Sequence, residues 1–147
     1  MAKVYSGKVV IPGDKIEEYF ELLKAAEEER APFRQHLMAL HADFYDHLAE
    51  RYMERTARKH AGVVEMFIEF IGGYTDVQDI SEITRGMVNT HFRKWWKRKV
   101  WDSSTPDDLR VALKKFFRFL ASEKGIVNEP ALKALQYQGR KLSGKFR

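Results

Sequence analysis

Apolar residues recur at intervals of three and four along most of the chain, and this spacing places them on one face of a helix. The pattern predicts helices at residues 15–30, 32–51, 54–71, 85–100, 106–124 and 130–137. Pro32 is expected to begin the second helix, and Gly72-Gly73 to end the third. Apolar residues in the loop at 74–83 are expected to point inward: Val77, Ile80 and Ile83. The predicted fold class is all-α.

The two ends of the chain differ from this helical pattern. Residues 3–11 alternate weakly around Ser6-Gly7, as in a short β-hairpin. Asp14 and Glu17 then resemble a capping box for the first helix, whose polar side is acidic. We expect residues 1–36 to form this hairpin and acidic amphipathic helix, residues 37–138 a helical domain, and residues 139–147 a basic tail.

Charge is distributed unevenly over the 147 residues, although the net charge is only +5. Residues 1–50 carry 6 Lys/Arg against 10 Asp/Glu, whereas residues 51–147 carry 20 against 11. A basic body behind an acidic leader favours a polyanionic partner for the body. The alternative is that the chain is one of many mildly basic proteins with no such partner.

Two predicted helices carry rows of cations beside an apolar stripe. In the fifth, Arg110, Lys114 and Arg118 are spaced by four, so they share a face. In the third, the cations Arg55, Arg58 and Lys59 lie near Gly62. A glycine inside a helix costs about 1 kcal/mol relative to alanine, so it either admits a neighbouring helix or lets a phosphate backbone approach. For a lone row of three cations, as in the fifth helix, a solvated face that keeps the protein dispersed is the more common explanation.

A third cationic cluster, "HFRKWWKRKVW" at residues 91–101, surrounds two tryptophans. If Trp95 and Trp96 were exposed, they would suit stacking on single-stranded bases. We expect instead that both are core residues and that the cations extend into solvent, where phosphate contacts remain open to them. The cations are Arg93, Lys94, Lys97, Arg98 and Lys99.

Catalytic and metal-binding patterns are weak. The chain has no cysteine, no His-Glu-x-x-His motif and no phosphate-binding glycine loop. Asp43 and His47 lie four apart on one helix, but such a pair is more often structural than catalytic. We therefore expect no enzyme site, cofactor or metal. No signal peptide or membrane-length apolar run is visible, so a cytoplasmic protein without a membrane partner is expected.

Three stretches of the chain match a known pattern: "FYDHLAERYMERTARKHAGVVEMFIEFI", "ISEITRGMVNTHF" and "TPDDLRVALKKFFRFLASEKGIVNEPALKAL". They resemble the core-binding domain of tyrosine recombinases and phage integrases, a SAM-like four-helix domain. The resemblance covers roughly residues 37–135, and "KKFFRFLASEKGIVNEP" is its most specific part. Two departures stand out. The chain has Asn128-Glu129-Pro130 where the family has Asn-Pro, and it lacks the catalytic domain, so no nucleophile is assigned to Tyr137.

The resemblance implies a SAM-like bundle that grips double-stranded DNA without cleaving it. In the family the second and fourth helices of this domain face the major groove, and they correspond to residues 54–71 and 106–124 here. These are the two helices with cationic rows. The candidate DNA-binding residues are Arg55, Arg58, Lys59, Lys97, Arg98, Arg110, Lys114 and Arg118.

Other functions remain open at this point. The acidic N-terminal helix suits a protein-interaction module that docks on a basic partner, such as a recombinase or the basic face of another copy. The same leader can instead cover the basic body and inhibit DNA binding. A histidine-carboxylate enzyme has only Asp43 and His47 in its favour.

Overall fold

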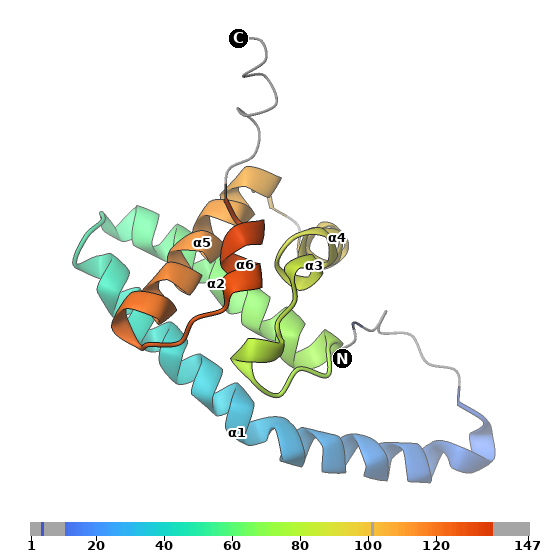
Figure 1. Cartoon of the computed structure of the whole chain (residues 1–147). Coiled ribbons are helices and arrows are strands. Elements are labelled where there is room, and N and C mark those ends of the chain that lie inside the picture. Colours follow the sequence, from blue (N-terminus) through green and yellow to red (C-terminus); the bar gives the residue numbers. More distant parts are fainter. Residues whose placement is uncertain (1–3, 5–10, 101, 137–147) are drawn as a thin grey trace. The chain divides into compact units, whose positions relative to one another are not determined.

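The computed structural model describes residue 4, residues 11–100 and residues 102–136 (Figure 1). The chain forms two compact units, Met1–Glu82 and Ile83–Arg147, each with its own internal packing. All regular elements of the described residues are helical, apart from an isolated bridge between Val4 and Thr75, so the all-α class is confirmed. The remainder of the expected hairpin, Tyr137 and the basic tail lie outside the described residues.

The first unit contains two long helices, α1 (Ile16–Ala49) and α2 (Glu54–Tyr74). A short 3-10 turn, Gly13–Lys15, precedes α1, and another, Ile80–Glu82, follows α2. The N-cap of α1 is Lys15, whose side chain makes no capping hydrogen bond, so the expected capping box at Asp14 is wrong.

Helix α1 runs through Pro32 without a break, so the expected start of a second helix at this proline is also wrong. A proline inside a helix removes one backbone hydrogen bond and costs about 3 kcal/mol. Contacts on both sides of Pro32, with the end of α2 and the loop after it, offset this cost. Arg30 donates to the backbone carbonyls of Ile71, Thr75 and Val77, and Arg34 donates to that of Gly72. The expected domain boundary between residues 36 and 37 lies inside this continuous helix. In the sequence, the first compact unit ends at Glu82 and the second begins at Ile83.

The C-terminal half of α1 packs antiparallel against α2 (Figure 1). The imidazole Nε2 of His41 lies 2.8 Å from the carbonyl oxygen of Ala61, between the two helices. Their core consists of buried apolar residues: Leu37, Leu40, Phe44, Leu48, Ala57, Ala61, Val64, Phe67 and Ile71.

Helix α2 continues through Gly72-Gly73 to Tyr74, so the expected stop at these glycines is wrong. Neither glycine has a positive φ. The backbone carbonyls at the end of α2 accept hydrogen bonds from side chains outside the helix. The hydroxyl of Thr75 donates to Ile71 at 2.6 Å, in addition to the bonds from Arg30. The following loop directs Val77, Ile80 and Ile83 inward, as predicted, with exposed fractions of 4% or less.

The second unit contains the helices α3 (Arg85–Val88), α4 (Thr90–Lys99), α5 (Pro106–Glu123) and α6 (Glu129–Ala134). Thr84 caps α3, accepting a hydrogen bond from the amide of Met87. The helix expected at 85–100 is interrupted at Asn89, which has non-helical angles of φ −120° and ψ −97°. Asparagine favours helix ends because its side chain competes with the backbone for hydrogen bonds.

The start of α5 matches the prediction closely. Thr105 and Asp108 form a reciprocal capping box, and Pro106 occupies the first position. The helix ends before Gly125, whose φ of +67° favours glycine. Residue Asn128 then caps α6 through Oδ1 and donates through Nδ2 to the carbonyl of Ile83, so its buried amide holds two segments together.

Candidate nucleic-acid interface

Helix α4 presents an exposed face made only of cations and neutral residues. Trp95 and Trp96 are 3% and 6% exposed, which confirms that they belong to the core and removes base stacking on them. Arg93, Lys94, Lys97, Arg98 and Lys99 are all exposed, and the helix contains no acidic residue. Lys94, Lys97 and Arg98 have no acidic partner among the described residues, so their charges are available to an anion.

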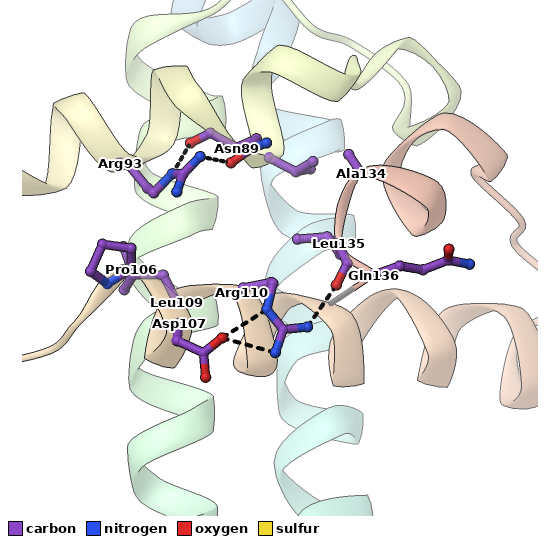
Figure 2. A pocket seen from close by; sticks show the side chains of 10 residues that line it. Asn89, Arg93, Pro106, Asp107, Leu109, Arg110, Ala134, Leu135 and Gln136 are labelled. Atoms are coloured by element: carbon purple, nitrogen blue, oxygen red, sulfur yellow. Dashed lines mark hydrogen bonds and ion pairs between the residues drawn. The ribbon is translucent and has the colours of Figure 1, made fainter. Parts of the chain in front are cut away.

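A cavity of about 400 Å³ lies between α4, α5 and α6 within the second unit (Figure 2). Arg93 and Arg110 both line it. Arg93 donates through Nε to the carbonyl of Asn89, 3.3 Å away, and also bonds the Asn89 side chain. The guanidinium of Arg110 bonds Asp107 at 2.9 and 3.0 Å, and it donates to the carbonyl of Leu135 at 2.9 Å. Both arginines are therefore held in place before any ligand arrives.

The cationic row of α5 is uneven along its length. Arg110 is only 21% exposed and its charge is largely neutralised by Asp107. Lys114 is half-buried and Arg118 is exposed, and neither has an acidic partner among the described residues. Partial burial, followed by the like charges of Arg118, Arg110 and Lys115, lowers the pKa of Lys114. A phosphate placed beside Lys114 and Arg118 would relieve this repulsion.

In the first unit, the cations near the start of α2 lie on an exposed face. Arg55, Arg58 and Lys59 are all exposed, and Arg58 forms an ion pair with Glu54 at 2.5 Å. An ion pair this exposed contributes little stability, so a phosphate can replace Glu54 at small cost.

Gly62 follows these cations one turn along α2. Apart from its chain neighbours and the nearby backbone of α2 itself, no described atom lies within 4 Å of the position that a Cβ would take at Gly62. The close helix packing that the sequence offered as one explanation of this glycine is therefore absent among the described residues. Approach of a ligand backbone remains the other explanation.

Two cations that the sequence patterns missed line a second cavity of the second unit, with a volume of about 470 Å³. Arg85 comes from α3 and Lys133 from α6, and the cavity also contains Asn89 and Thr90. Both cations are exposed and have no acidic partner among the described residues. They are 48 positions apart in the sequence, so no local spacing could have paired them.

The remaining candidate chemistry lies on α1. His47, in the last turn of α1, contacts the guanidinium of Arg51 through Nδ1 at 3.1 Å, and Arg51 lies in the turn that follows the helix. Within residues 11–100 and 102–136, no group of three histidine or carboxylate side chains is arranged to hold a metal ion. The helices described in these ranges are each too short or too polar to cross a bilayer.

Comparisons of the chain with protein-family models, with curated proteins and with solved structures find no match.

Proposed function

We propose that this chain is a non-catalytic module that binds double-stranded DNA in the cytoplasm, with the SAM-like architecture of a tyrosine-recombinase core-binding domain. One observation carries the proposal: the second unit places the acid-free face of α4 and the unpaired cations Lys114 and Arg118 of α5 on a compact helical scaffold. Cations without acidic partners gain most from phosphates, because binding releases the counterions of the DNA.

The arrangement favours duplex DNA over single strands. Single-strand binding depends on exposed aromatic side chains, and both tryptophans of α4 are buried. Exposed lysines and arginines instead suit contacts with the phosphates of a duplex, which position a protein without specifying sequence. In the first unit, Arg55, Arg58 and Lys59 supply further contacts of the same kind.

Arg110 has a different part in this proposal. Its bonds to Asp107 and Leu135 fix its guanidinium, so it positions α6 against α5 and does not supply a mobile phosphate contact. The phosphate contacts of α5 then come from Lys114 and Arg118.

A titration of fluorescein-labelled duplex DNA, followed by fluorescence anisotropy at several salt concentrations, tests the proposal. Each neutralised phosphate contributes about −0.9 to the slope of log K against log salt, so about six contacts predict a slope of about −5. The double variant Lys94→Glu/Arg118→Glu should bind at least tenfold more weakly. The control Lys24→Glu, on the acidic part of α1, should weaken binding only by the amount that its smaller change of net charge predicts. Absence of binding at low salt, or binding that ignores salt, would contradict the proposal.

A further inference from the structure

The N-terminal half of α1 carries an exposed apolar stripe. Ile16, Phe20 and Leu23 are spaced as i, i+4 and i+7, with exposed fractions of 42%, 61% and 42%. Exposed glutamates surround them on the same helix: Glu17, Glu18, Glu21, Glu27 and Glu28. Apolar anchors with this spacing are typical of a helix that lies in a groove of a partner.

The second unit contains a groove of matching character. It has a volume of about 440 Å³ and lies between α4 and the start of α5. Its apolar lining comes from Trp96, Val100, Pro106 and Leu109, and its cations are Arg93, Lys94 and Lys97. Asp102 and Ser104 complete the lining. We call this site the α4–α5 groove.

Trp96 forms part of the apolar lining of this groove. Its side chain is 94% buried, since 6% is exposed, and its indole nitrogen has no hydrogen-bond acceptor among the described residues. A buried donor without an acceptor is costly, and an incoming carboxylate or carbonyl oxygen would remove that cost only if the groove lining moved to expose the nitrogen.

We propose that the α4–α5 groove binds the N-terminal half of α1 from a second copy of this chain. The apolar anchors of α1 would meet the apolar lining, and its glutamates would meet Arg93, Lys94 and Lys97. Pairing of α1 with α1 would bring glutamates together, and pairing of α4 with α4 would bring cations together. The contact is therefore heterologous, with a different surface used on each copy, and such contacts build rings or open chains.

Sedimentation velocity of the full chain at low salt, without nucleic acid, tests this proposal over a range of concentrations. The stripe variant Phe20→Ser/Leu23→Ser and the groove variant Lys94→Glu/Lys97→Glu change exposed side chains, and circular dichroism checks that both fold. The unaltered chain should self-associate. Each variant alone should do so at least tenfold more weakly, because each lacks one of the two surfaces.

An equimolar mixture of the two variants gives the decisive result. The stripe variant retains the groove and the groove variant retains the stripe, so the mixture should form a one-to-one complex. A chain that stays monomeric throughout, a mixture that behaves as its separate parts, or a groove variant that associates normally would each overturn the proposal. The stripe variant should keep its DNA affinity, so this inference and the proposed DNA binding fail separately.

Discussion

The guanidinium of Arg110 donates a hydrogen bond to the backbone carbonyl of Leu135, with a nitrogen–oxygen distance of 2.9 Å. This bond ties the end of α6 to α5, and the ion pair with Asp107 fixes the same guanidinium from the other side. The three cations of the α5 row are evenly spaced in sequence, but this contact gives the first of them a structural task that Arg118 does not share.

Replacement of Arg110 by alanine should lower the free energy of unfolding by about 1.5–3 kcal/mol, because a hydrogen bond to a charged group is lost from a partly buried site. The matched variant Arg118→Ala should change it by less than about 0.5 kcal/mol, since an exposed side chain without a partner is removed. Urea denaturation followed by circular dichroism measures both. DNA affinity, compared under conditions where both variants are folded, should fall more for Arg118→Ala, and the reverse order would refute this division of roles.

Local signals explain which parts of the fold could be predicted from the sequence. The start of α5 at Pro106 and its end before Gly125 depend on residues within a few positions of each other, and the predicted range of 106–124 differs from the observed Pro106–Glu123 by one residue. The path of α1 through Pro32 depends on Arg30 and its acceptors at the end of α2 and in the loop after it, more than 40 positions away. Local rules place a helix start at Pro32 because they contain no information about that contact.

The contact of Arg30 with the end of α2 can be tested by replacing Arg30 with methionine. The guanidinium donates to Ile71 at 3.1 Å and to Val77 at 2.6 Å, as well as to Thr75. Its removal takes one donor from each of these three carbonyls, of which Ile71 keeps the Thr75 hydroxyl, and should cost about 1.5–3 kcal/mol. We expect amides of residues 16–30 to exchange with solvent faster in this variant, because the half of α1 before Pro32 loses its attachment.

Arg34→Met is the control for this experiment. Arg34 is exposed and makes one longer bond, 3.3 Å, to Gly72, so its loss should have a small effect. Equal effects of the two variants on hydrogen exchange would show that Arg30 does not hold the helix across Pro32.

Substitution of Gly62 should change both the free energy of unfolding and the affinity for DNA. The open space around it allows a methyl group, so Gly62→Ala should raise the free energy of unfolding by about 0.5–1 kcal/mol. If a phosphate backbone approaches this point, the same variant should weaken DNA binding. Gly73→Ala is the matched control, because Gly73 also lies in α2 with no atom within 4 Å of the added carbon. A more stable Gly62→Ala variant with unchanged DNA affinity would exclude the close approach.

Local spacing in the sequence could likewise predict some residues of the candidate interface but not others. Spacing by four found Lys114 and Arg118, because neighbours on one helix face follow from helix geometry alone. Arg85 and Lys133 share a cavity only because α3 and α6 pack together. The burial of Arg110 also depends on α6, so the sequence predicted its position on the helix but not its hydrogen bond to Leu135.

Lys114 makes stability depend on pH in a definite direction. Its pKa lies below the ordinary value of 10.5, first because of partial burial and then because of Arg118, Arg110 and Lys115. At neutral pH the lysine is charged in both states, and its charge is less favourable in the folded chain. As the pH rises from the lowered pKa toward 10.5, the folded state loses this proton first, so the unfolded state binds more protons and stability increases.

Replacement of Lys114 by methionine should therefore raise the free energy of unfolding at pH 7, and the advantage over the unaltered chain should shrink as the pH approaches 10.5. Urea denaturation of both proteins from pH 7 to pH 10.5 measures the difference directly, so other titrating groups cancel. An advantage that stays constant with pH would assign the effect to apolar packing of methionine and not to removal of the charge. The same variant should reduce the magnitude of the salt slope for DNA binding by about 1, because one phosphate contact is lost.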